Sequence, residues 1–217
     1  MSSPRSCDLD ADGATAPVPG GEQDLHAHFR RVDRPSLEDL TVACLGHGPH
    51  QSTRPLVRLV DLEGVRAVVK DFGEGGSLAR GAYGAWMVRR ESRAYRFLEG
   101  LPGVPRFLGT VDAHALVIEF IPGDAFRGVR GLELPGRYFD TLRAVIESMH
   151  GRGVIHLDLS QRKNFLIRDD GSPFVIDFAS AVVFRHPRWN PLFWLGRWFD
   201  RSSLAKLERK YRRNWSE

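Results

Sequence analysis

At 217 residues and 24.4 kDa, the chain has the size of one large domain or two small lobes. Its 42% hydrophobic and 27% charged residues are typical of a globular protein, which excludes a mostly disordered chain and a collagen-like repeat. Cys7 and Cys44 are the only cysteines, too few for a disulfide scaffold or a CxxC zinc site. The formal net charge is +4, and residues 185–217 hold nine Lys and Arg against three Asp and Glu, so the rest is slightly acidic.

Residues 1–23 are rich in Ser, Gly, Pro, Ala and Asp and show no hydrophobic periodicity, so we expect a disordered leader. This segment lacks the basic and apolar regions of a secretory signal peptide. No apolar run approaches the roughly 20 residues that a membrane-spanning helix needs. Together with the two cysteines, these features favour a cytoplasmic location.

Residues 24–122 are expected to form a small, β-rich N-lobe. The strand-like runs at 56–60 and 65–70 are joined by the turn signal DLEG at 61–64 and predict a hairpin. Two further strand-like runs, at 104–109 and 115–121, follow later, and Pro122 and Gly123 end the second of them.

A helix is predicted between these strand pairs, from Ser77 to about Gly100. Glu91 lies on the face of this helix that otherwise carries apolar residues. A carboxylate buried alone is costly, so Glu91 is expected to have a cationic partner.

Residues 123–217 are expected to form a mainly helical C-lobe. A helix is predicted over 134–152, and three short apolar segments follow at 153–156, 164–167 and 173–177, separated by polar loops. Strands followed by helices indicate an α+β fold with two lobes.

Two aspartates and one asparagine adjoin these short apolar segments. Asp158 lies in HLDLSQRKNFLI at 156–167, which also contains Asn164, and Asp177 lies in VIDFA at 175–179. An Asp at the end of a buried strand points its charge toward a cleft, and two carboxylates with an amide oxygen suit Mg²⁺.

With these motifs the chain resembles the protein-kinase superfamily, and the resemblance implies a bilobal fold that binds ATP and Mg²⁺. Lys70, in VVK at 68–70, matches the third-strand lysine, and Glu91 matches the helix glutamate that pairs with it. Asp158 matches the catalytic aspartate. Asn164 and Asp177 match the two residues that bind the metal.

Residues 115–123 resemble the fifth strand and hinge of that family, and the resemblance implies adenine contacts around Glu119 and Ile121. It covers residues 40–180, with the elements in the family order. Only 40 residues follow Asp177 and no APE motif occurs, so the chain looks most similar to compact bacterial kinases with a truncated C-lobe. These are the RIO-type kinases and the lipopolysaccharide core kinases.

The chain departs from the family pattern at several positions. Asp158 and Asn164 are six positions apart, one more than in the family, so either the loop carries an insertion or Lys163 occupies the asparagine position. Ala179 replaces the glycine of the DFG motif. The glycine-rich loop is represented only by Gly46 and Gly48.

Two functions remain open. The first is an ATP- and Mg²⁺-dependent phosphotransferase that moves the γ-phosphoryl group to a hydroxyl of a protein, a saccharide or a lipid-linked sugar. The second is a pseudokinase that binds nucleotide or a protein partner without turnover, which the departures favour and the retained Lys, Glu and Asp residues oppose.

The tail from Trp189 to Phe199 is rich in aromatic and aliphatic residues flanked by arginines. It predicts either a helix that closes the C-lobe core or an amphipathic segment that binds the anionic inner face of a membrane, and we favour the core helix. Nucleic acid is disfavoured as a partner, because basic and aromatic residues alone do not establish it.

Overall fold

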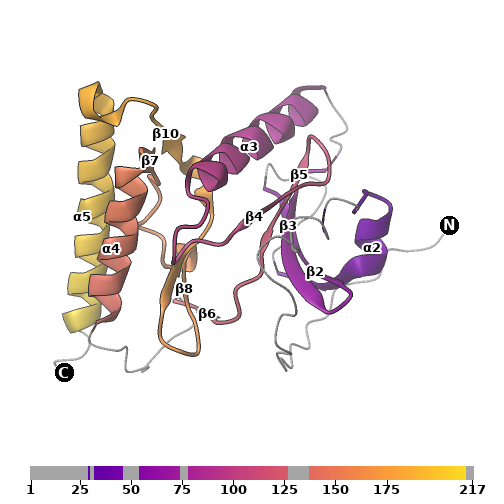
Figure 1. Cartoon of the computed structure of the whole chain (residues 1–217), viewed down its shortest axis with the longest axis horizontal. Helices are drawn as coiled ribbons and strands as arrows, with labels where there is room; N and C mark the ends of the chain where they lie inside the picture. Colours follow the sequence, from indigo (N-terminus) through magenta and orange to yellow (C-terminus); the bar gives the residue numbers. More distant parts are fainter. Residues whose placement is uncertain (1–28, 30–31, 46–53, 74–77, 127–136, 214–217) are drawn as a thin grey trace. The chain divides into compact units, whose positions relative to one another are not determined.

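The computed structural model describes residues 29, 32–45, 54–73, 78–126 and 137–213 (Figure 1). The expected leader at 1–23 and the glycines Gly46 and Gly48 lie outside the described residues. The chain divides into two compact units, the first made of Met1–Arg89 with Phe107–Phe120 and the second of Arg90–Arg106 with Ile121–Glu217. The lobe boundary expected at residue 122 stays a prediction.

In the first unit, five described strands form an antiparallel sheet in the order β1-β2-β3-β5-β4. The strands are β1 (Thr41–Cys44), β2 (Leu56–Leu62), β3 (Val65–Asp71), β4 (Phe107–Thr110) and β5 (Ala115–Glu119). The short helix α2 (Ser36–Leu40) precedes β1. Buried apolar side chains of the sheet pack with Phe29, Val32 and Leu37 to form the core of this unit.

The predicted hairpin at 56–70 is present as β2 and β3. Its two-residue loop, Glu63 and Gly64, has φ angles of 53° and 84°, the conformation of a turn whose twist matches that of the strands. The Asp61 Oδ1 atom accepts the Gly64 N–H at 2.8 Å and closes the turn. The turn sets a register that pairs Lys70 with Val57 on one side and with Leu116 of β5 on the other.

Helix α3 (Leu78–Phe97) contributes to both units. In the first unit, Gly84 lies so close to Phe72 that an added Cβ would be 3.0 Å from the Phe72 Cβ. From residue 90 onward the helix belongs to the second unit, where Glu91, Ala94 and Tyr95 are buried.

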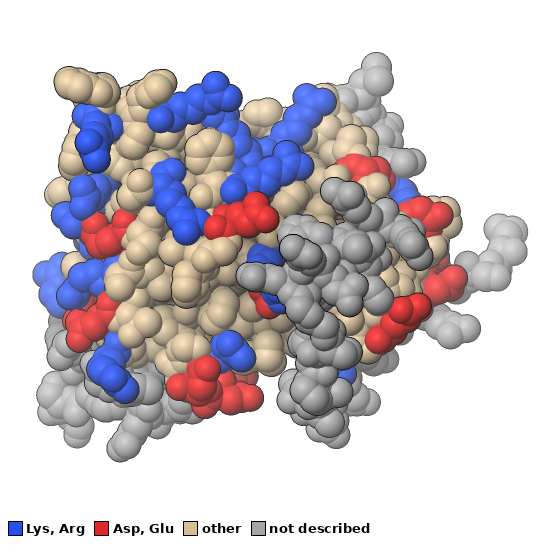
Figure 2. Space-filling view, viewed as in Figure 1, with Lys and Arg blue, Asp and Glu red and all other residues tan. Residues whose placement is uncertain are grey.

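The second unit contains helices α4 (Tyr138–Gly151) and α5 (Pro191–Arg213), which lie side by side (Figure 1). Two small antiparallel sheets accompany them. One is β6 (Asp124–Ala125), β8 (Phe165–Ile167) and β9 (Pro173–Val175), and the other is β7 (Val154–Ile155) with β10 (Val182–Val183). Lys and Arg side chains are frequent along the edge where α5 lies (Figure 2).

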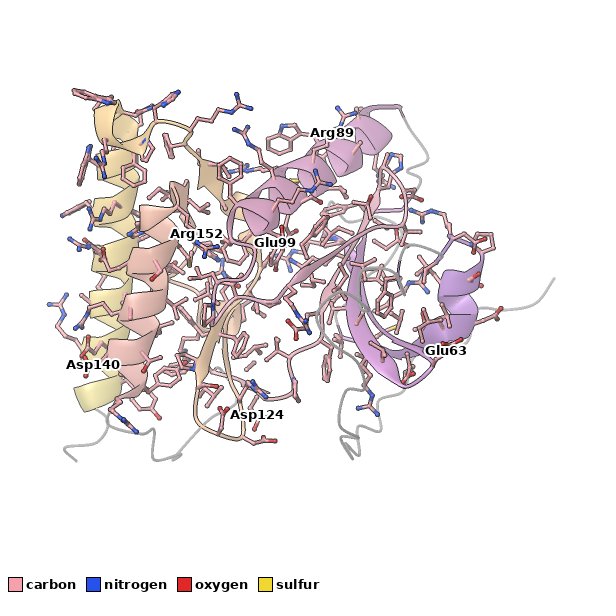
Figure 3. All side chains as sticks on the ribbon, in the orientation of Figure 1. Glu63, Arg89, Glu99, Asp124, Asp140 and Arg152 are labelled. Carbon is pink, nitrogen blue, oxygen red and sulfur yellow. The ribbon has the colours of Figure 1, made fainter. Side chains whose placement is uncertain are left out.

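Glycine and arginine fix the end of α4. Gly153 follows the helix with φ of 78°, and a Cβ there would lie 2.4 Å from the Phe184 carbonyl oxygen, so only glycine fits. Arg152 donates from Nη1 to the Glu99 carbonyl oxygen at 2.6 Å and links the end of α4 to the turn after α3 (Figure 3). The chain therefore enters β7, and the loop beyond it, in one defined direction.

Helix α5 buries apolar side chains on one side and exposes others on the opposite side. Phe193, Leu204 and Leu207 are buried, so the helix does close the core of the second unit. On the outer side of its first two turns, however, large apolar side chains remain exposed. No helix within the described ranges is both long and apolar enough to cross a membrane.

Candidate active site

The loop after β7 brings Asp158 and Asn164 together. The Asn164 Nδ2 atom donates to the Asp158 Oδ2 atom at 3.0 Å and to the Asp158 carbonyl oxygen at 2.9 Å. Gln161 donates from Nε2 to the other carboxylate oxygen of Asp158 at 3.0 Å. Two neutral amide donors thus hold the orientation of a half-buried carboxylate.

A single 3₁₀ turn, Arg162–Asn164, absorbs the extra residue of this loop. The turn leaves Lys163 exposed and buries Asn164, which is only 1% exposed. Of the two candidates, it is therefore Asn164 that reaches Asp158. The Asn164 carbonyl oxygen also accepts the Ile176 N–H at 2.9 Å, so the same residue ties this loop to the segment that carries Asp177.

Two features of Asn164 and Asp177 suit a metal ion. Because the amide nitrogen of Asn164 is used by Asp158, its Oδ1 atom is buried without a hydrogen-bond partner among the described residues. A buried acceptor of this kind costs free energy unless a ligand satisfies it. Asp177 has φ of 67° and ψ of 70°, a left-handed conformation that is uncommon for non-glycine residues and that recurs at active sites and ligand clamps.

His156 is fully buried, and its two hydrogen bonds define its tautomer. The Nδ1 atom accepts the Asp158 N–H at 3.3 Å, whereas Nε2 lies 3.1 Å from the Ile176 carbonyl oxygen, which can only accept. The imidazole is therefore neutral with its proton on Nε2. Burial lowers the pKa of His156, against the opposing charges of Asp200, Asp177 and Asp158. His156 supports the backbone of the site and is not a catalytic group.

Sequence reasoning missed Asp200, which lies on α5 and is completely buried. Its carboxylate accepts the His156 N–H at 2.8 Å and the Leu157 N–H at 2.9 Å, and His150 Nε2 lies 3.1 Å from the same carboxylate. Leu157 has φ of 65°, so Asp200 holds the loop in a strained conformation immediately before Asp158. The signal available in the sequence was a lone Asp beside the buried positions of an apolar helix.

Three rings in edge-on and tilted contact connect this loop with the Asp177 segment and α3. The Phe178 ring lies 4.9 Å from the Tyr95 ring and 4.9 Å from the His156 ring, measured between centroids. All three residues are at most 1% exposed. The contact fixes Phe178 inside the core of the unit and so limits the positions that the adjacent Asp177 can adopt.

Arg90 is a second residue that sequence reasoning missed. Its Nε atom donates to the Ala181 carbonyl oxygen at 3.0 Å, and its Nη2 atom donates to the Ser180 carbonyl oxygen at 2.6 Å. These carbonyls end the turn that Asp177 begins. Arg90, which directly precedes Glu91 on α3, therefore supports the Asp177 segment through these two hydrogen bonds.

The sequence family agrees with this geometry. Residues 79–195, which include the whole loop and the Asp177 segment, match the RIO domain. The chain belongs to the RIO domain family. This confirms the predicted resemblance to RIO-type members of the protein-kinase-like superfamily.

Individual relatives of this RIO domain are kinases. It is 32% identical over 74 residues to serine/threonine-protein kinase rio2 of Schizosaccharomyces pombe, covering 34% of this chain and 21% of that protein. It is 31% identical over 138 residues to CBL-interacting protein kinase 20 of Oryza sativa subsp. japonica, covering 59% and 29%. The chain thus spans less than a third of the length of these curated relatives.

Solved structures confirm the predicted α+β, protein-kinase-like fold. The crystal structure of the Rio2 kinase-ADP/Mg²⁺-phosphoaspartate complex from Chaetomium thermophilum matches with a TM-score of 0.59 and 22% identity, covering 87% of this chain and 60% of that one. A second structure of the same kinase gives a TM-score of 0.56 at 21% identity, covering 84% and 59%. Similarity at this identity establishes the shared fold.

The remaining predicted site residues of the chain are divided between the units. Lys70 on β3 and Glu119 at the end of β5 belong to the first unit, and Glu91 on α3 and Ile121 belong to the second. Lys70 and Glu91 are 8% and 0% exposed, so neither is a surface charge. The pairing of Lys70 with Glu91 and the adenine contacts of Glu119 and Ile121 stay predictions.

The literal DFG tripeptide of this sequence, Asp71-Phe72-Gly73, lies outside the Asp177 segment and has a structural role. The Asp71 carboxylate forms an ion pair with Arg34 at 3.0 Å and accepts the Gly73 N–H at 2.8 Å. Arg34 also binds Asp112 at 2.6 Å, and these carboxylates raise the pKa of its guanidinium. The chain order and the contacts of Asp177, rather than the letters DFG, identify the metal-binding candidate.

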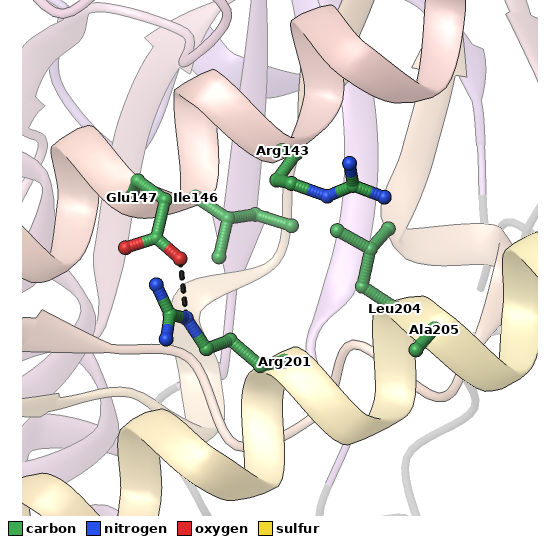
Figure 4. A pocket seen from close by; sticks show the side chains of 6 residues that line it. All are labelled: Arg143, Ile146, Glu147, Arg201, Leu204 and Ala205. Atoms are coloured by element: carbon green, nitrogen blue, oxygen red, sulfur yellow. Dashed lines mark hydrogen bonds and ion pairs between the residues drawn. The ribbon is translucent and has the colours of Figure 1, made fainter.

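A hollow between α4 and α5 is distinct from these residues (Figure 4). It has a volume of about 220 Å³ and is lined by Arg143, Ile146, Glu147, Arg201, Leu204 and Ala205. Its charges are already paired, Arg201 with Glu147 at 2.5 Å and Arg143 with Glu208 at 2.6 Å. The hollow is smaller than usual ligand pockets and contains none of the predicted site residues.

Proposed function

We propose that this RIO domain is an ATP- and Mg²⁺-dependent phosphotransferase whose acceptor is a hydroxyl group. The observation that carries the proposal is the Asn164 amide. Its nitrogen holds the Asp158 carboxylate, while its oxygen is left buried without a described partner. One residue thus connects a base for the acceptor hydroxyl with an oxygen ligand for a cation.

In this proposal Asp158 is the catalytic residue. Its carboxylate orients the acceptor hydroxyl and takes its proton as the hydroxyl oxygen bonds to the γ-phosphorus and the bond to ADP breaks. Lys70, held by Glu91, orients the α- and β-phosphates, and the chain around Glu119 and Ile121 contacts adenine. These four roles rest on the resemblance of the sequence to kinases.

Asn164 and Asp177 would hold Mg²⁺. An amide oxygen and a carboxylate are suitable ligands for this cation, which completes its shell with waters and phosphate oxygens. Among the described residues no cluster of three or more His, Cys, Asp or Glu could hold a metal ion by itself, which agrees with a site completed by nucleotide phosphates. When bound, Mg²⁺ neutralises phosphate charge.

The acceptor class stays a prediction, with protein, saccharide and lipid-linked sugar as the candidates. The rio2 relative is named a serine/threonine-protein kinase, which supports a protein hydroxyl. The resemblance of the compact chain to lipopolysaccharide core kinases, given in the sequence analysis, is the argument for a saccharide. A cytoplasmic location likewise stays a prediction.

The experiment that tests this function is calorimetric titration of the protein with ATP, with and without Mg²⁺. Parent protein and Asp177→Asn are compared, with Asp169→Asn as the matched control because Asp169 is an exposed turn residue. We expect Mg²⁺-dependent binding that weakens at least about tenfold in Asp177→Asn only. Binding that ignores Mg²⁺, or no binding, favours the pseudokinase.

A further inference from the structure

The outer face of α5 changes character along the helix axis. Large apolar side chains are exposed at its start and on Trp189, two residues before it: Trp189 89%, Leu192 65%, Trp194 49%, Leu195 61%, Trp198 64% and Phe199 43%. Leu192, Leu195 and Phe199 share one stripe by helical spacing, and Trp194 and Trp198 form the neighbouring stripe. Farther along, the exposed positions carry basic side chains, Arg201, Lys206, Arg209 and Lys210.

The core of the second unit does not need these exposed apolar side chains for the packing of α5. The opposite side of the same turns packs inward through Phe193 and through Gly196, where an added Cβ would lie 2.9 Å from Ile155 Cγ2. The helix is therefore anchored without the exposed residues. Six large apolar side chains within eleven residues form a patch of the kind that marks a binding surface.

Exposed basic residues flank the patch. Of the carboxylates on α5, Asp200 is completely buried and Glu208 is paired with Arg143 at 2.6 Å. On α4, Glu147 is paired with Arg197 and Arg201. The exposed Arg185 and Arg188 precede the patch, and the basic positions of α5 follow it. The uncharged surface at the start of α5 is bordered by Lys and Arg side chains in Figure 2.

We propose that this face of α5 binds an anionic lipid bilayer in the plane of its interface. Tryptophan is suited to the boundary between headgroups and acyl chains, and flanking arginines are attracted to anionic headgroups. Arg197 supports the arrangement, since it lies over the Trp194 ring at 5.3 Å while its Nη2 atom binds Glu147 at 2.7 Å.

A second copy of the chain fits this face less well. An isologous contact would place the same patch against itself, and the basic residues that flank it would then meet basic residues. A bilayer offers the opposite charge and a surface that adapts to a convex helix face. The inference goes beyond phosphotransfer and does not depend on it.

The test is co-sedimentation of the full chain with vesicles of phosphatidylcholine alone and with about 30% phosphatidylglycerol. The variant is Leu195→Ser/Trp198→Ser, and the control is Trp86→Ser on α3, because Trp86 is 52% exposed and lies outside α5. We expect the parent and the control to bind the anionic vesicles, less so at high salt, and the double variant to bind at least about tenfold more weakly.

Three results would overturn the proposal: no binding of the parent to anionic vesicles, equal binding of the double variant, or self-association of the parent that the double variant abolishes. Circular dichroism accompanies the assay and must show equal helicity for all proteins. A second double variant, Leu192→Ser/Phe199→Ser, replaces the first if that one does not fold. Vesicle binding is measured without nucleotide, so the result is independent of the proposed kinase activity.

Discussion

The Oδ2 atom of Asp200 accepts the backbone N–H of His156 at 2.8 Å, across 44 residues of sequence. The same carboxylate accepts the next N–H, that of Leu157, so one buried side chain satisfies two consecutive backbone donors. The path of the chain into Asp158 thus depends on a residue from the last described helix.

Replacing Asp200 with Ala should therefore destabilise the second unit by about 3 kcal/mol, because two buried N–H groups and His150 lose their acceptor. Urea unfolding followed by circular dichroism measures the change. Asp140→Ala is the control, since Asp140 is 69% exposed and its ion pair with Arg143 is long, at 3.6 Å. Equal stability of the two variants would contradict the positioning role of Asp200.

Asp158→Asn should abolish turnover while nucleotide binding is retained. The substituted amide cannot take a proton, and we expect ADP formation to fall at least about a hundredfold. ADP release measures turnover, and calorimetry measures the affinity for ATP. The exposed Asp169→Asn variant should behave as the parent. If Asp158→Asn forms ADP at the parental rate, Asp158 is not the base.

Arg90→Lys should weaken the Mg²⁺-dependent affinity for ATP by roughly three- to tenfold. A lysine cannot donate to the Ser180 and Ala181 carbonyls with the fixed geometry of a guanidinium, so the Asp177 segment loses part of its support. Arg93→Lys on the exposed side of α3 serves as the control. A loss of stability with unchanged Mg²⁺ dependence would indicate that Arg90 only holds the fold together.

The stability of the protein should fall as the pH decreases below about 6.5. Burial lowers the pKa of His156 below its unfolded value of 6.5, so the unfolded chain binds more protons between the two values. The slope contributed by one such group is at most about 1.4 kcal/mol per pH unit. His156→Gln should flatten the dependence between pH 7.5 and 5.5. Identical slopes in the parent and the variant would refute this origin.

Gly153→Ala should cost more stability than Gly100→Ala, although both glycines have positive φ, 78° and 68°. A Cβ at residue 100 meets nothing within 4 Å, so that variant pays only for its backbone conformation, about 1 kcal/mol. At residue 153 the Cβ also collides with the Phe184 carbonyl oxygen, and we expect about 3 kcal/mol in total. Thermal unfolding of the two variants side by side tests the difference.

The elements that could be predicted from the sequence are those with local signals. The hairpin at 56–70 carries its turn residues, Glu63 and Gly64, between two apolar runs, and α4 carries a regular apolar stripe. Asp158, Asn164 and Asp177 were recognisable because each adjoins a short buried strand. Hydrophobic periodicity and turn-forming residues are local signals that span few residues, so they can be read from one sequence.

Asp200 and Arg90 could not be identified in this way, because each acts on backbone groups that are distant in sequence. The acceptors of Arg90 are backbone carbonyls 90 and 91 residues away. Every residue has a backbone carbonyl, so the sequence does not indicate which ones accept a hydrogen bond. The double character of α5 was also hidden. The buried side and the exposed side of the helix both carry apolar residues, so the sequence alone does not show which side faces the core.

Helix α5 presents Trp198 and Phe199 to the outside and, at the next residue, Asp200 to the backbone of the loop that carries Asp158. Anything that binds the outer face favours the helical state of the segment from which Asp200 acts. If both proposals hold, a bilayer on the outer face and a nucleotide beside the Asp158 loop would be linked through this segment. Such linkage is reciprocal, so each ligand would strengthen the binding of the other by the same factor.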